Sequence, residues 1–137
     1  MIKRLRDLLL RRAEKLFKDS IKSYEEGFYD LALVYLEQSL QLFLKVEILE
    51  KYSKFPKTHN LRVLFEVLNY DLSDDELLVV DLLEDTYISG RYLEKEYSEE
   101  EYKRALEFEK LKKHKIDLER NKDKYFRNLE KSVLGLY

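Results

Sequence analysis

Apolar side chains recur every three or four positions along most of this chain, which is the spacing of one face of an α-helix. The first such stretch covers residues 3–26 and keeps its lysines and arginines on the other face. Residues 29–52 differ, because the run LALVYL and the apolar positions after it leave little polar surface. A helix of that kind must be covered on most sides. We therefore expect it at the centre of the fold, shared with a second subunit.

Glycine and proline mark the ends of the next elements. Gly27 ends the first helix, since glycine readily takes the left-handed conformation common at helix C-termini. The only proline, Pro56, disfavours helical geometry in the residue before it, so residues 54–57 are expected to form a connector. A third helix is expected over residues 58–69, with Thr58 able to cap its first turn.

Two S-x-x-E capping boxes open the last two predicted helices. The first box begins at Ser73 and predicts a helix to about residue 87, and the second begins at Ser98 and predicts a helix to about residue 131. Gly90 is expected in the loop between them. The last helix exceeds the second by about ten residues, so either it kinks near residues 112–115 or its end packs on another subunit.

These elements predict an all-α fold, an antiparallel up-and-down bundle of four or five helices. One domain over residues 1–137 is expected, and a homodimer. The composition agrees, because three glycines and one proline in 137 residues allow few chain reversals. Cysteine is absent from the sequence, which excludes disulfides and thiolate chemistry and favours a cytoplasmic location. The longest apolar run, residues 31–36, is too short to cross a membrane.

Charge is unevenly distributed along the chain. Residues 1–24 have a balance of +5, residues 69–101 of −10, and residues 102–137 of +5. The basic and acidic segments are either neighbours in the bundle or leave a positive face for a polyanion. The basic runs on the first and last helices consist of Arg4, Arg6, Arg11, Arg12, Lys15, Lys18 and Lys22, and of Lys110, Lys112, Lys113 and Lys115.

Residues 27–49 are the most informative stretch and read GFYDLALVYLEQSLQLFLKVEIL. Their Gly-x-Tyr-Asp-x-Ala entry and the later Gln and Lys resemble the second-helix signature of HEPN domains. The matching positions are Gly27, Tyr29, Asp30, Ala32, Gln38 and Lys45. Ser39 and Gln41 depart from the usual Ala and Glu. KTHNLRVL at 57–64 and SGRYLEKEYS at 89–98 resemble two further HEPN segments, in the same order and spacing.

The resemblance implies a small helical bundle that binds nucleotides or nucleic acid, as in toxin–antitoxin pairs, with a minimal nucleotidyltransferase as partner and no cofactor. HEPN ribonucleases also carry an Arg followed, after four to six residues, by a His. Neither histidine meets this requirement. The positions concerned hold Tyr52, Ser53 and Lys54 before His59, and Glu107, Phe108 and Glu109 before His114.

The resulting function is a nucleotide- or nucleic-acid-binding HEPN domain without the ribonuclease motif. We name no catalytic residue and no metal ligand, because two distant histidines without cysteine give no metal-ligand spacing. The candidate contact residues for nucleotide or nucleic acid are Lys57, His59, Arg91 and Tyr97. For His59 we weigh this role against a structural one in the first turn of the third helix, with its ring bonded to a nearby backbone group.

Two alternatives stay open. One is a divergent HEPN ribonuclease that uses Arg91 with Tyr97 or another residue as proton carrier. The other is a structural protein-interaction module, because YEEGFYDLALVYLEQSLQL also fits one tetratricopeptide-like helix pair. Such repeats need about three copies at a 34-residue period to bury a core, and position 61 begins no second copy.

Overall fold

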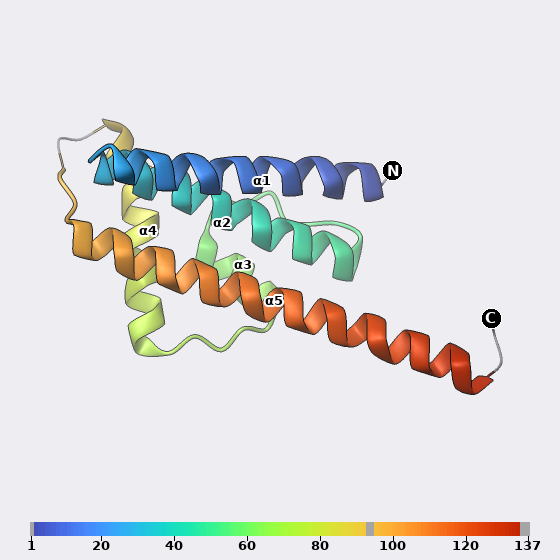
Figure 1. Ribbon diagram of the computed structural model, residues 1–137. Helices are drawn as coiled ribbons and strands as arrows, with labels where there is room; N and C mark the ends of the chain where they lie inside the picture. Colours follow the sequence, from blue (N-terminus) through green and yellow to red (C-terminus); the bar gives the residue numbers. More distant parts are fainter. Residues whose placement is uncertain (1, 93–94, 135–137) are drawn as a thin grey trace.

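A computed structural model describes the backbone of residues 2–92 and 95–134, and the side chains of residues 2–86 and 95–117. Its elements are helices throughout these ranges, which confirms the predicted all-α bundle (Figure 1). The helices are α1 (Ile2–Glu25), α2 (Tyr29–Tyr52), α3 (Leu61–Val67), α4 (Asp74–Tyr92) and α5 (Glu99–Leu134).

The helix α2 is the centre of the fold, as its apolar sequence predicts. It packs against each of the other four helices. In Figure 1, α1 and α2 lie side by side in opposite directions, α4 stands steeply across α2, and α5 passes along the near side. The side chains of α2 that are almost completely buried include Ala32, Leu33, Leu36, Leu40, Leu44 and Ile48. Its sharing with a second subunit stays a prediction.

The turn between α1 and α2 depends on Gly27, as expected. Its φ is +86°, its N–H donates to the carbonyl of Tyr24 at 3.0 Å, and the N–H of Phe28 donates to that of Ser23 at 2.9 Å. This pair of bonds is the Schellman motif, which satisfies the last carbonyls of a helix. The returning α2 comes close to α1, where the hydroxyl of Ser39 donates to the carbonyl of Ala13 at 2.9 Å.

The helix α3 begins at Leu61, three residues later than predicted. The cap is Asn60, whose side-chain oxygen accepts from the N–H of Val63 at 3.2 Å. The expected role of Thr58 as the cap is therefore wrong, and its hydroxyl instead accepts from the N–H of Asn60 at 3.1 Å. Thr58 and Asn60, two residues apart, are both of a type that caps helices, and Asn60 does so here.

Both capping boxes form as predicted. Ser73 and Glu76 exchange bonds at the start of α4, and Ser98 and Glu101 do so at the start of α5. However, α4 continues to Tyr92 and so contains Gly90, which was expected in a loop. One glycine costs a helix only about 1 kcal/mol, so it need not end one. The helix α5 is unbroken over 36 residues, so the kink near residues 112–115 is also wrong.

Three helices meet at a buried tyrosine, Tyr102 of α5. Its ring stacks on Tyr24 of α1, with centroids 4.7 Å apart. Its hydroxyl lies 3.0 Å from that of Ser20, which donates its own proton to the carbonyl of Ala32 in α2 at 2.6 Å. The Tyr102 hydroxyl is therefore the donor to Ser20. This chain of bonds fixes the start of α5 against the α1–α2 pair.

Candidate functional site

His59 lies in the connector before α3, with its ring held against α2. Its Nδ1 is 3.0 Å from Oε1 of Gln41, and the Gln41 amide nitrogen donates to the buried carboxylate of Glu37. Because that amide oxygen can only accept, Nδ1 of His59 carries the proton and donates. The ring thus bonds to a side chain of α2, whereas the sequence suggested a backbone group in the first turn of α3.

Lys45 continues the polar row that Glu37 and Gln41 begin, at a spacing of four residues. It is 8% exposed, and its ammonium lies 5.7 Å from the ring centroid of Phe55. Burial lowers the pKa of Lys45, and the carboxylate of Glu37 partly opposes that effect. This row was missed as a unit, although polar residues at a four-residue spacing inside an otherwise apolar helix are a recognisable signal.

Tyr97 is almost fully buried, at 6% exposure. Its hydroxyl donates to Oδ2 of Asp85 at 2.7 Å, and the ammonium of Lys95 bonds to the same oxygen. Burial raises the pKa of Tyr97, and the bond to Asp85 raises it further. The Tyr97 hydroxyl therefore stays protonated and faces α4.

Glu84, next to Asp85 in α4, bonds to the start of α3. Oε1 of Glu84 accepts from the N–H of Leu61 at 2.7 Å and from that of Arg62 at 3.4 Å. Glu84 thereby binds the positive N-terminal end of α3. The two neighbouring carboxylates of α4 thus join the segment with His59 to the segment with Tyr97.

The four predicted contact residues are only partly brought together. Lys57 and His59 are exposed on one connector, whereas Tyr97 is buried and donates to Asp85 of α4. Arg91 lies in the last turns of α4, and its side chain is outside the described residues. Their role in binding stays a prediction.

One of the positions where a ribonuclease arginine would precede His114 is buried. Glu109, five residues before the exposed His114, has 0% exposure and lies between α5 and α2. Burial raises the pKa of Glu109 well above its usual range. A buried acid stands where a cation would be needed to stabilise a phosphate in the transition state.

Most of the basic run on α5 makes contacts inside the protein. Lys112 forms an ion pair with Glu76 of α4. Lys113 lies over Phe17 and Phe43, with its ammonium 5.4 and 4.7 Å from the ring centroids. Lys115 lies 4.9 Å from the ring centroid of Tyr70. These three lysines attach α5 to the rest of the bundle.

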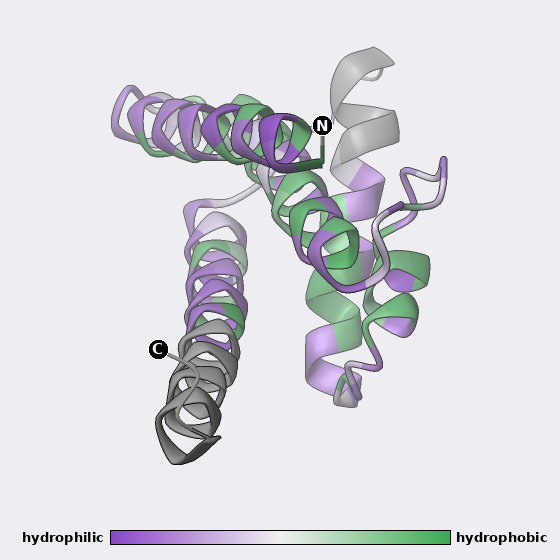
Figure 2. Ribbon diagram, turned by 90° about the vertical axis from the view of Figure 1, so that its right-hand side faces the viewer, coloured by the Kyte–Doolittle hydropathy of each residue, from purple (hydrophilic) through white to green (hydrophobic). Residues whose placement is uncertain are grey.

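The basic run on α1 is different, because it faces solvent. Arg11, Lys15, Lys18 and Lys22 are exposed and follow one another at spacings of four, three and four residues, which places them on one face. We call these four residues the basic stripe. It extends roughly 16 Å along the helix. Lys15 pairs with Asp19 at 2.8 Å, and the other three form no ion pair within the described part of the chain. Figure 2 shows hydrophilic residues along this outer side of α1.

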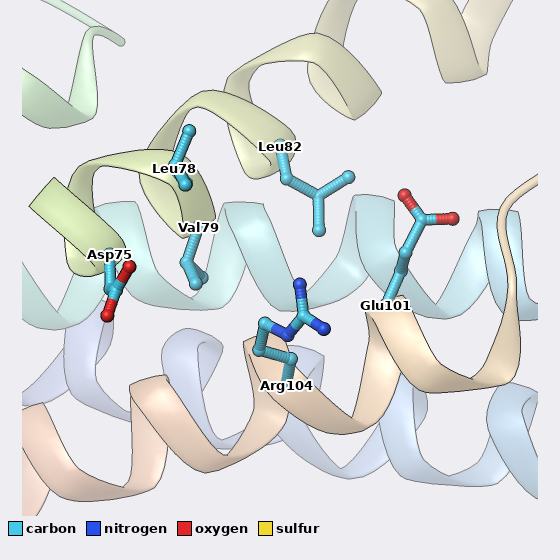
Figure 3. Close-up of a pocket in the computed structure, with 6 residues that line it drawn as sticks. All are labelled: Asp75, Leu78, Val79, Leu82, Glu101 and Arg104. Atoms are coloured by element: carbon cyan, nitrogen blue, oxygen red, sulfur yellow. The ribbon is translucent and has the colours of Figure 1, made fainter.

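A groove between α4 and α5 has a volume of about 570 Å³ (Figure 3). Val79 and Leu82 of α4 point toward Arg104 of α5 across it, and Leu78, which also lines the groove, is 66% exposed. Charges of both signs line this groove, so it does not concentrate positive charge as the basic stripe does.

In the described ranges, no three His, Asp or Glu side chains are grouped as metal ligands, and no helix has the length and apolar character of a membrane span.

Comparison with known proteins adds one finding to this geometry. The family model described as the HEPN domain matches residues 7–111, which is most of the chain. No curated protein matches the chain in a sequence comparison. The match runs from the second turn of α1 through the first third of α5 and includes all three resembling segments, so the tetratricopeptide alternative is not needed. The chain belongs to the HEPN domain family.

Proposed function

We propose that this HEPN domain binds single-stranded RNA or a similar phosphate polymer through the basic stripe and does not cleave it. Family membership supports a nucleic-acid-related function in general terms. The observation that carries the specific proposal is the stripe itself, four exposed cations on one helix face, three of them without an ion pair in the described residues. Such a surface attracts phosphates irrespective of base sequence.

The stripe predicts a distinct salt dependence. Each phosphate neutralised by a lysine or arginine releases counterions, and for single strands the slope of log K against log salt is about −0.7 per contact. Four contacts therefore give a slope near −3 (about 4 × −0.7). Binding governed by stacking on aromatic rings would have a smaller slope.

The absence of cleavage rests on three placements. Neither histidine has an arginine at the required distance in sequence. Glu109 is buried at one of the tested positions, and the hydroxyl of Tyr97 is engaged by Asp85. A tyrosine that is buried and donates to a carboxylate is a poor proton carrier near neutral pH.

The experiment measures binding of a fluorescent 20-nucleotide single-stranded RNA by anisotropy over a range of salt concentrations. The double variant Lys18→Glu with Lys22→Glu should lower the affinity for the RNA at least about tenfold. The slope of log K against log salt should also be shallower. The control, Lys54→Glu with Lys110→Glu, makes the same charge change at exposed lysines elsewhere and should bind like the wild type. Equal losses in the two double variants would contradict the stripe and favour a diffuse or connector-centred interaction.

Cleavage is tested on the same RNA, labelled at one end. The wild type should leave it intact. Cleavage that Arg91→Ala abolishes would favour the divergent ribonuclease, and this variant in the binding assay also tests the predicted contact of Arg91. Cleavage that persists in Arg91→Ala would point to a different site or to a contaminant.

The proposal also includes the partners that the family suggests. The whole chain, 1–137, would act as one domain in the cytoplasm, as a homodimer, beside a minimal nucleotidyltransferase in a toxin–antitoxin type of pair. The dimer rests on family membership, because the other four helices of the same chain already cover α2. Light scattering at micromolar concentration should give twice the chain mass, and a monomer would refute this part. Co-purification with a nucleotidyltransferase encoded nearby would test the second partner.

A further inference from the structure

A hollow of about 580 Å³ lies where the first turns of α1 pass the end of α2. Its floor is apolar, and arginines stand at its edge. The lining residues are Ile2, Arg4, Leu5, Leu8, Arg11, Leu49 and Ser53. We call it the α1–α2 hollow.

The apolar part of the hollow is open to solvent. Ile2 is 44% exposed and Leu5 is 40% exposed, whereas Leu49 beneath them is buried at 3%. Single exposed leucines are ordinary on a protein surface. Here, however, Ile2, Leu5 and Leu8 follow one another at three-residue spacing around a concave site, which is the pattern of a docking surface.

On the opposite side of the α1–α2 pair, another helix of the same chain packs along the groove. Leu10 is turned about 200° from Leu8 around α1 and lines a different hollow, together with Phe43 of α2 and Ile116 of α5. A helix, α5, therefore packs along one side of the pair, while the α1–α2 hollow on the other side is open. Grooves between adjacent helices are filled by a further helix through ridges-into-grooves packing.

The charges at the hollow have one sign. Arg4 and Arg11 are seven residues apart, which separates them by about 10 Å along one face of α1. Both are exposed and form no ion pair within the part of the chain that the structure describes. Arg6, by contrast, bonds to Asp7 and Glu50. No carboxylate lines the hollow among the described residues.

We propose that the α1–α2 hollow docks an acidic amphipathic helix of a partner protein. The partner helix places apolar side chains, at positions i, i+3 or i+4, and i+7, over Leu5, Leu8 and Leu49. Its carboxylates, seven residues apart, pair with Arg4 and Arg11. Arginines around an apolar centre are a typical composition of protein interfaces. The site overlaps the RNA contact proposed above only at Arg11.

The test uses a fluorescent helical 15-residue peptide with leucines at the stated spacing and glutamates flanking them, measured by anisotropy with the full chain. Leu5→Asp and Arg4→Glu should each weaken binding at least tenfold. Lys3→Glu makes the same charge change as Arg4→Glu outside the lining residues and should bind within about twofold of the wild type. A peptide with lysine in place of its Arg4-facing glutamate should bind Arg4→Glu better than it binds the wild type. Circular dichroism checks that each variant is folded.

Several results would overturn the proposal. One is equal binding of a peptide with the same composition in scrambled order. Another is an equal loss in Lys3→Glu, which would indicate charge attraction without a defined site. A third is that the peptide does not bind and that the protein forms a homodimer which Leu5→Asp dissociates. This result would mean that the hollow contacts a second copy of the chain. Lys18→Glu with Lys22→Glu should retain peptide binding, so that failure of the RNA proposal and failure of this one are distinguishable.

Discussion

Replacing Glu109 by glutamine should stabilise the protein at neutral and alkaline pH. Glu109 has 0% exposure, and neither carboxylate oxygen has a hydrogen-bond partner in the part of the chain that the structure describes. Burial raises the pKa of Glu109, and the nearby carboxylate of Glu37 raises it further, while the ammonium of Lys113 opposes the shift. Glutamine has nearly the same shape and never carries a charge.

The magnitude follows from proton linkage. The Glu109 carboxyl holds its proton in the folded state at pH values where the unfolded chain has lost it. Above the unfolded pKa, near 4.5, the free energy of unfolding therefore falls by up to about 1.4 kcal/mol per pH unit, until the folded pKa is passed. Glutamine is as unpaired in this site as a protonated glutamate, but it removes the linked loss, so at pH 8 Glu109→Gln should exceed the wild type by about 1.4 kcal/mol for each pH unit between the unfolded and the folded pKa.

Urea unfolding followed by circular dichroism between pH 5 and 8 measures this effect. The wild type should lose stability as the pH rises, and the Glu109→Gln variant should show a flatter profile. Glu107→Gln is the matched control, since Glu107 is exposed on the same helix two residues earlier. Its profile should parallel that of the wild type.

The reasoning would be refuted if Glu109→Gln lowered the stability at pH 8 by more than about 1 kcal/mol while the wild type became more stable with rising pH. That result would mean that Glu109 is ionised in the folded protein and that its pairing with Lys113 outweighs the cost of burial.

Three further predictions concern two contacts between helices and one helix cap. Tyr102→Phe removes the donor to Ser20 and should cost about 1 kcal/mol in urea unfolding, while Tyr102→Leu should cost more because the ring stack is also lost. Asn60→Ala removes the cap of α3 and should cost about 1 kcal/mol, and Asn60→Asp should restore it. Lys112→Met should lower stability by about 1 kcal/mol, whereas the same change at exposed Lys110 should stay within about 0.5 kcal/mol. Equal effects at the two lysines would contradict a role of the Lys112 ion pair.

Much of the fold could be predicted from local signals. The helix α2 has the predicted bounds, because Gly27 and the apolar run fix its start and the connector before Pro56 fixes its end. The capping boxes place the starts of α4 and α5. The prediction was wrong where two signals compete within a few residues, as at Thr58 and Asn60, and where a weak helix breaker such as Gly90 is overridden by its neighbours.

The candidate site was predicted less completely, for a different reason. A sequence shows which side chains carry charge, but not which of them have partners distant in the chain. Lys112 and Lys18 look alike in the sequence, yet one is paired with Glu76 and the other faces solvent. Likewise, Glu84 and Asp85 read as ordinary residues of an acidic helix, although they hold two segments of the family signature.

The neighbouring positions of Glu84 and Asp85 make α4 sensitive to changes in length. One inserted residue turns everything beyond it by about 100° around the axis and moves it 1.5 Å along the axis. An insertion early in α4 would therefore remove the acceptor for the start of α3 and the acceptor for Tyr97 in a single step. The connector at residues 53–60 is not helical, so an inserted residue there does not rotate the following side chains around a helix axis. Insertions in this chain should be tolerated at the exposed Lys54, ahead of the residues that contact α2 and cap α3, and rejected in the first three turns of α4.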